Sequence, residues 1–200
     1  HYDRYNPALS PKLHKEIPGP GAGCMYDLGP HVIDQALYLF GMPDAVFADL
    51  AITRPTSKVD DYFEILLYYP TKRVRLKAGY FVREPFPSFV VHGSLGSFLK
   101  SRADIQEPQL QAGVKPGGAD WGIEPESAKG LLHTEKSGTV IKEYVPTLAG
   151  NYGEYYEGIY NALRHNKPMP VTGEDGVNTV TIIETAFASS KEKKVIELNR

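Results

Sequence analysis

Three stretches near the middle of the chain alternate between apolar and polar residues. They span residues 46–52, 61–69 and 73–81. A period of two is typical of β-strands, because successive side chains point to opposite faces of a sheet. Turn-forming residues separate the three runs, at 55–57 and at 70–71. The pattern therefore predicts three adjacent antiparallel strands joined by short links.

Shorter patterns lie on either side of these strands. Residues 88–93 and 96–100 predict a hairpin of two further strands, and residues 195–198 predict a last short strand. Residues 1–5 predict a strand at the start, followed by a long irregular connection rich in proline and glycine. Residues 101–138 show no such regularity, and we expect an irregular excursion or insertion there.

Apolar residues at helical spacing predict three helices. The first begins near residue 31 and ends at Gly41, which is placed to cap its C-terminus. The second covers residues 151–166 and the third about residues 174–190. Consecutive strands with helices at both ends predict an α+β fold, in which helices pack on one face of an open, mostly antiparallel sheet. A second subunit often covers the other face of such a sheet.

Composition narrows the class of partner. The 200 residues carry a net charge of −2, which gives no reason to expect nucleic acid or an anionic membrane as partner. No apolar run approaches the roughly 18 residues needed to cross a membrane. The single cysteine, Cys24, excludes an intrachain disulfide and suits a reducing compartment, so we expect a cytoplasmic protein. We also expect the Cys24 thiol to be buried and unreactive.

One titratable cluster stands out in residues 21–34, GAGCMYDLGPHVID. Asp27, His31 and Asp34 are spaced by four and three residues, the offsets that place side chains on one face of a helix. Three interpretations are open from spacing alone. His31 can be satisfied locally near a helix start, Asp27 and His31 can form a carboxylate–imidazole pair for proton transfer, or all three can bind a metal.

Other motifs of known chemistry are missing from the sequence. No GxGxxG follows a strand, so the dinucleotide-binding fingerprint is absent. The sequence also holds no phosphate-binding loop ending in Gly-Lys-Ser/Thr, no HExxH and no paired CxxC. The cluster in residues 21–34 is therefore the main candidate for chemistry.

The run GAGCMYDLGPHVIDQAL, residues 21–37, closely resembles the signature of the C-terminal domain of the glucose–fructose oxidoreductase/inositol dehydrogenase (Gfo/Idh/MocA) family. Further pieces resemble that domain in order along the chain: the Asn-Pro at 6–7, VVHGSLGSF at 90–98, YYEGIYNAL at 155–163 and PVTGEDGVNTVTIIE at 170–184. The resemblance covers essentially all 200 residues. It implies one substrate-binding and oligomerisation domain, residues 1–200, like the C-terminal domain of glyceraldehyde-3-phosphate dehydrogenase.

The resemblance also implies roles for individual residues. His31 looks like the residue that hydrogen-bonds the reacting hydroxyl, and Asp27 looks like its catalytic carboxylate partner. Asp34 matches a position that reaches the polyol, and Asn6 and Tyr80 are further substrate-pocket candidates. Family members bind NAD or NADP on an N-terminal Rossmann domain, which also supplies a lysine from a Glu-Lys-Pro motif. Neither that domain nor that motif is present, and Lys-Glu-Ile-Pro at 15–18 has the wrong order and place.

We therefore expect the substrate-binding domain of an NAD(P)-dependent oxidoreductase that acts on a sugar, polyol or related secondary alcohol. The resemblance places the cofactor site and the lysine in the missing domain, so we expect this chain alone to bind no cofactor tightly and to be inactive. We expect no bound metal, and a homo-oligomer formed through the open sheet face. The alternatives are a non-catalytic carbohydrate-binding or assembly module, and a metal-dependent enzyme that uses Asp27, His31 and Asp34.

Overall fold

The computed structural model describes residues 1–198, which divide into two compact units. One unit combines residues 1–85 with the chain from residue 173 onward, and the other comprises residues 86–172. The α+β class with open, antiparallel strands is confirmed. The expectation of one sheet is wrong in detail, because the strands form two four-stranded sheets, one in each unit.

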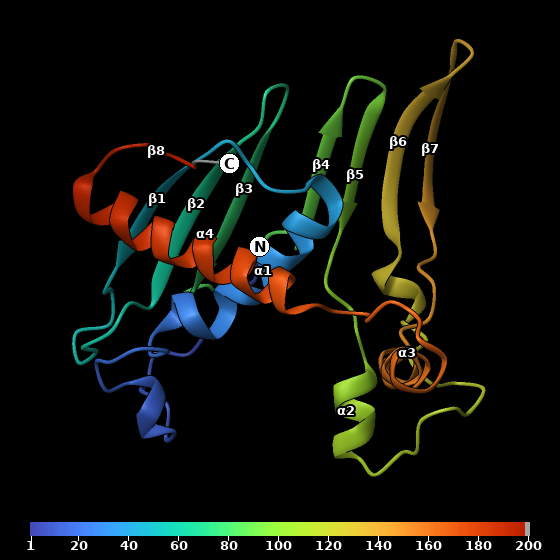
Figure 1. Cartoon of the computed structure of the whole chain (residues 1–200). Helices are drawn as coiled ribbons and strands as arrows, with labels where there is room; N and C mark the ends of the chain where they lie inside the picture. Colours follow the sequence, from blue (N-terminus) through green and yellow to red (C-terminus); the bar gives the residue numbers. More distant parts are fainter. Residues whose placement is uncertain (199–200) are drawn as a thin grey trace. The chain divides into compact units, whose positions relative to one another are not determined.

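The first unit contains the predicted meander. Its sheet has the order β3-β2-β1-β8, with β8 at the end of the chain pairing with β1 (Figure 1). The strands are β1 (Ala45–Ala51), β2 (Tyr62–Tyr68), β3 (Arg73–Gly79) and β8 (Ile196–Glu197). The predicted strand 1–5 is an extended segment along β3. The amides of Tyr2 and Arg4 donate to the carbonyls of Lys77 and Gly79, each at 2.9 Å.

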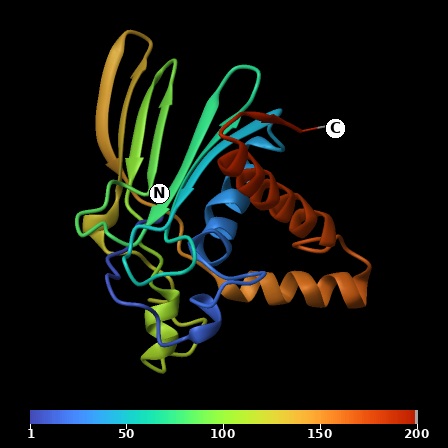
Figure 2. The same ribbon diagram turned by 90° about the vertical axis from the view of Figure 1, so that its left-hand side faces the viewer.

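Two helices cover one face of this sheet (Figure 2). They are α1 (Cys24–Phe40) and α4 (Gly173–Glu192), which also pack against each other. The core lies between the helices and the sheet, and its largest fully buried side chains include Phe63, Ile65, Met25, Leu28 and Ile182. Burial along β2 alternates residue by residue, as the period-two pattern predicts.

Helix α4 also completes the hydrogen bonding of β1. Strand β8 pairs only with Ala45 and Val46, so the rest of this edge of β1 needs other partners. The amides of Ala48 and Leu50 donate to the hydroxyls of Ser189 and Ser190, each at 2.9 Å. Both serines are buried, so these bonds attach the last turns of α4 to the sheet.

Helix α1 begins seven residues earlier than expected, at Cys24 instead of residue 31, and continues through Pro30. Pro30 lacks one intrahelical donor, a cost that favours a helix start after it when the sequence alone is considered. Burial of the first turns outweighs that loss, since Cys24, Met25 and Leu28 are all in the core. The predicted C-terminal cap is confirmed, because the Gly41 amide donates to the Leu37 carbonyl at 2.8 Å.

The second unit holds the other sheet, with the order β4-β5-β6-β7. The hairpin of β4 (Phe89–Gly93) and β5 (Gly96–Lys100) was predicted and is confirmed. The remaining elements are η2 (Glu126–Ala128), α2 (Gln106–Gln111), β6 (Gly130–Lys136), β7 (Thr139–Val145) and α3 (Tyr152–His165).

The expectation of an irregular excursion at 101–138 is partly wrong, because this stretch contains α2 and β6, and β6 forms a regular hairpin with β7, which follows it. These strands bury few side chains, so they carry little apolar alternation. The available signal was their two-residue turn, Ser137-Gly138, in which both residues have positive φ angles of 52° and 78°. Such turns match the twist of antiparallel strands. Trp121, before this hairpin, is buried with 6% of its surface exposed.

Within residues 1–198, no helix combines the length and the apolar character needed to span a membrane.

Candidate functional site

A cavity of about 430 Å³ lies in the first unit, between the N-terminal segment and the start of α1. Its wall includes residues 4–12, and Asn6 is among them. The backbone amide of Asn6 donates to the backbone carbonyl of Tyr80 at 2.8 Å. This bond attaches the N-terminal segment to the chain directly after β3. Asp27, from the first turn of α1, and Tyr80 line the same cavity. The structure thus brings together three residues that sequence resemblance singled out.

Asp27 is the acceptor at the centre of this group. The Tyr80 hydroxyl donates to Asp27 Oδ2 at 3.3 Å, and Lys15 Nζ forms an ion pair with Oδ1. Lys15 belongs to a short helix, η1 (Leu13–Lys15), in the irregular N-terminal connection. The Asp27 side chain is 23% exposed, so the carboxylate is held by protein donors and still accessible.

Tyr80 is a hydrogen-bond donor in this site. Burial, together with the nearby Cys24 and Asp27, raises the pKa of its phenol well above the ordinary value. The hydroxyl therefore keeps its proton at neutral pH. Burial likewise raises the pKa of the Cys24 thiol far above its ordinary value, and nearby Asp60 and Asp27 add to the effect. The prediction that Cys24 is buried is confirmed, and its raised pKa makes the thiol a poor nucleophile.

His31 and Asp34 lie on later turns of α1 and are not among the residues that line the cavity. His31 is exposed, and its ring packs edge-on against Tyr2 with 5.4 Å between ring centroids. Asp34 is also exposed. Asp27 and His31 share a helix face by their spacing of four residues. Their catalytic and binding roles stay predictions.

No three His, Cys, Asp or Glu side chains within residues 1–198 are placed to hold a metal ion together. The geometry therefore lends no support to the metal-binding interpretation of Asp27, His31 and Asp34.

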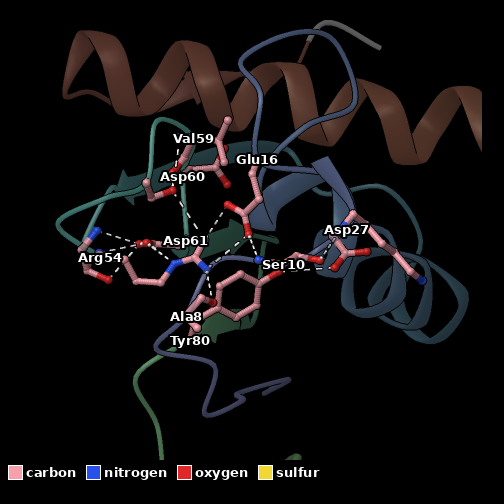
Figure 3. A network of polar contacts seen from close by, with 12 residues as sticks. Ala8, Ser10, Glu16, Asp27, Arg54, Val59, Asp60, Asp61 and Tyr80 are labelled. Carbon is pink, nitrogen blue, oxygen red and sulfur yellow. Dashed lines mark hydrogen bonds and ion pairs between the residues drawn. The ribbon is translucent and has the colours of Figure 1, made fainter. Parts of the chain in front are cut away.

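A buried guanidinium holds the wall of the cavity in place (Figure 3). Arg54 Nε donates to Asp61 Oδ2 at 2.9 Å, and the Arg54 terminal nitrogens donate to Glu16 Oε2 at 3.0 Å and to the Ala8 carbonyl at 3.0 Å. Only 2% of the Arg54 side chain is exposed. One cation therefore ties the loop before β2 to two points of the N-terminal segment.

Both charges in the Arg54–Asp61 pair are stabilised. Burial opposes the charge on Asp61, but hydrogen bonds from the Thr53 and Arg54 amides and from the Arg54 guanidinium hold its pKa below the ordinary value. Burial also opposes the charge on Arg54, but hydrogen bonds to Asp61 and Glu16 hold its pKa above the ordinary value. The pair is thus ionised at neutral pH.

Asp60, next to Asp61, fixes the N-terminus of α1. Its carboxylate accepts a hydrogen bond from the Met25 amide at 2.6 Å, and its backbone carbonyl accepts one from the Cys24 amide at 2.7 Å. The preceding Gly23 has a φ of +91°, and a Cβ at this position would collide with the Asp60 carboxylate. Burial raises the pKa of Asp60 to about 6.

Sequence reasoning missed Lys15, Glu16, Arg54 and Asp61 at this site. Lys15 and Glu16 were considered only as part of an unsuitable motif. Arg54 and Asp61 lie beside predicted strands, and no local spacing relates them to residues near the start of the chain. Both stretches, residues 10–18 and 53–61, are rich in proline and polar residues, so these charges do not stand out in the sequence.

Comparison with known proteins places the chain in a family. Residues 1–198 match the C-terminal alpha/beta domain of the Gfo/Idh/MocA oxidoreductase family. The chain therefore belongs to this family, as its motifs suggested.

Named relatives and solved structures agree with this assignment. The chain is 39% identical over 197 residues to scyllo-inositol 2-dehydrogenase (NADP(+)) IolW of Bacillus subtilis, a match that covers 98% of this chain and 55% of the relative. The structure of YvaA from Bacillus subtilis matches with a TM-score of 0.92 and 38% identity, over 99% of this chain and 56% of that one. An oxidoreductase from Bacillus cereus matches with a TM-score of 0.87 and 30% identity, over 100% and 58%. The chain thus spans just over half the length of the relatives it matches.

The buried guanidinium of Arg54 is needed to neutralise two buried carboxylates. Arg54→Met should lower the free energy of unfolding by about 3–5 kcal/mol, because it leaves the carboxylates of Asp61 and Glu16 buried without their cation. Urea denaturation measures the loss. Lys194→Met is the matched control, since Lys194 is 63% exposed and pairs with Glu192 at the surface. That change should cost less than about 1 kcal/mol. Equal losses in the two variants would contradict the role given to Arg54.

The raised pKa of Asp60 makes the stability of the protein depend on pH. A carboxyl whose pKa is raised from 3.8 to about 6 on folding contributes stability below pH 3.8 that is lost as the pH rises through 6. The difference in free energy of unfolding between the unmodified protein and the Asp60→Asn variant should therefore fall by about 2–3 kcal/mol between pH 4 and pH 7. In the Asp60→Asn variant, the side-chain amide oxygen can still accept from the Met25 amide.

Thr56→Ser provides the control for this measurement, because Thr56 is exposed and its hydroxyl does not titrate in this range. The free-energy difference between this variant and the unmodified protein should not change with pH. A pH-independent difference for Asp60→Asn would show that Asp60 does not titrate in this range.

Proposed function

We propose that this chain is the substrate-binding domain of an NAD(P)-dependent oxidoreductase that acts on a sugar, polyol or related secondary alcohol. The observation that carries the proposal is the accessible Asp27 carboxylate, which lies with Tyr80 and Asn6 in one cavity. The 39% identity to a scyllo-inositol 2-dehydrogenase supports the substrate class. Carboxylate, phenol and amide groups provide both acceptors and donors for the hydroxyls of such a substrate.

The described strands do not form the doubly wound parallel sheet of a Rossmann domain. The paired strands of both sheets run antiparallel, whereas a dinucleotide binds at the crevice of a parallel, doubly wound sheet. We propose that an N-terminal Rossmann domain of the intact protein supplies this site, as well as a lysine for proton transfer. The match covers 55% of the first relative, so about 45% of that relative lies outside it. This length is enough for such a domain.

The oxidation of a secondary alcohol removes a proton from oxygen and a hydride from carbon, and the nicotinamide supplies the hydride acceptor. The residues of this chain act on the oxygen side. We propose that Asp27 accepts a hydrogen bond from a substrate hydroxyl in the cavity. The assistance of His31 in proton transfer is proposed from its place in the family motif, one turn after Asp27, because His31 does not line this cavity. Tyr80 donates to Asp27 and so restricts the rotation of the carboxylate.

Activity of the intact protein tests this proposal. The full-length protein should reduce NADP⁺ or NAD⁺ in the presence of at least one of scyllo-inositol, myo-inositol and glucose, while this chain alone should bind no NADPH saturably. Asp27→Asn in the full-length protein should lower kcat by about 100-fold or more, because it removes the carboxylate from the reacting hydroxyl. Asp120→Asn should leave kcat unchanged, because Asp120 is exposed and does not line the cavity.

Two results would contradict it. Saturable NADPH binding by the isolated chain would place a nucleotide site where none is proposed. A full-length protein that binds a polyol but oxidises none would favour the alternative of a carbohydrate-binding module.

We further propose that the protein forms a homo-oligomer through the sheet face opposite α1 and α4. Leu66 lies on that face in β2, between Phe47 of β1 and Arg75 of β3, and its side chain is partly exposed. Leu66→Lys adds a charge beside Arg75 and should shift the full-length protein to a smaller species in light scattering. A monomeric original protein, or an unchanged mass in the variant, would contradict this arrangement.

A further inference from the structure

Lys15 is one of the cavity-lining side chains to which neither motif nor spacing pointed. Its Nζ forms an ion pair with Asp27 Oδ1, and both side chains line the cavity that also contains Asn6 and Tyr80. One third of the Lys15 side chain, 33%, is exposed. The ammonium group is therefore in contact with the candidate carboxylate and can also reach a molecule in the cavity.

The backbone around Lys15 is held on both sides. The Lys15 amide donates to the Lys12 carbonyl at 2.9 Å, and the Gly23 amide donates to the Lys15 carbonyl at 3.2 Å. The next residue, Glu16, accepts hydrogen bonds from buried Arg54 and from the Ser10 amide, the latter at 2.7 Å. These backbone and side-chain contacts fix the position of Lys15, so its side chain is held close to Asp27.

The Lys15–Asp27 pair leaves donors and acceptors unused beside each other. An ammonium group has three N–H donors, and one of them is directed to Asp27. Each carboxylate oxygen can accept a further hydrogen bond beyond the one from Lys15 or Tyr80. A hydroxyl group is both a donor and an acceptor, so one alcohol oxygen can accept from Lys15 while its proton points to Asp27.

Arg54 does not provide this function, although it lines the same cavity. Its guanidinium nitrogens are directed at Asp61, Glu16 and the Ala8 carbonyl, and its side chain is almost fully buried. Its contacts hold the wall, and the lysine supplies the accessible donor next to Asp27.

We propose that Lys15 is a substrate-binding residue which, together with Asp27, clamps one hydroxyl of the polyol from two sides. The clamp belongs to this domain and is distinct from the lysine proposed for the Rossmann domain. This inference rests on the proposed function, since it assigns another residue to the same substrate site. It predicts that Lys15 contributes to the affinity for the polyol and that the affinity for the nucleotide does not depend on it.

Steady-state kinetics of the full-length protein test the clamp. Lys15→Met should raise the KM for the polyol by about tenfold to a hundredfold, the effect of losing one hydrogen bond to a charged group, with the KM for NADP⁺ unchanged. Lys15→Arg keeps a charged donor and should recover part of the loss. Lys191→Met is the control, because exposed Lys191 lies near the end of α4 and does not line the cavity. All variants should keep the unfolding temperature of the original protein within a few degrees.

The outcomes separate the clamp from the proposed function. An active protein whose Lys15→Met variant keeps its polyol KM overturns the clamp and leaves the function standing. Equal losses of thermal stability in Lys15→Met and Lys15→Arg, without a selective change in polyol KM, also overturn it. If the protein oxidises no polyol, calorimetric titration with scyllo-inositol decides. Binding that Lys15→Met abolishes supports the clamp while the enzymatic function fails, and absence of binding overturns both.

Discussion

The contact between Arg54 and its two carboxylate partners is the interaction on which the candidate site depends. Asp61 directly precedes β2, and Glu16 belongs to an N-terminal segment in which most residues are exposed. A guanidinium suits this position, because its planar set of donors can satisfy two carboxylates and a carbonyl at once. Removing these charges from water is costly, so the network defines one arrangement of the segment more than it adds net stability.

The rest of the site follows from that arrangement. With Glu16 held by Arg54, the adjacent Lys15 reaches Asp27 on α1. Asp60 and Asp61 have different roles. Asp61 forms an ion pair with the guanidinium, and Asp60 accepts a hydrogen bond at the N-terminus of the helix that carries Asp27. The two neighbouring carboxylates have opposite pKa shifts. Burial raises the pKa of Asp60, whereas hydrogen bonds from the Thr53 and Arg54 amides and from the guanidinium outweigh burial and lower the pKa of Asp61.

The local elements were largely predictable, and the exceptions have physical causes. The meander β1–β3 and its inward residues follow from alternation, because one face of that sheet is covered by helices. The hairpin β6–β7 was missed because its strands bury few side chains, so the pattern that reveals strands is weak there. The start of α1 was misplaced because the intrinsic cost of Pro30 is visible in the sequence, whereas the burial of Cys24, Met25 and Leu28 is not.

The sequence by itself determined the family, three of the four α-helices of the described residues, most strands, and the cluster of Asp27, His31 and Asp34 on one helix. These features depend on residues close together in the chain. The tertiary structure decided which side chains meet. Tyr80 lies 53 positions from Asp27, Arg54 lies 38 positions from Glu16, and Lys15 comes from a segment without a regular pattern. Such contacts depend on where the loops pack against the sheet, and spacing along the chain carries no information about that.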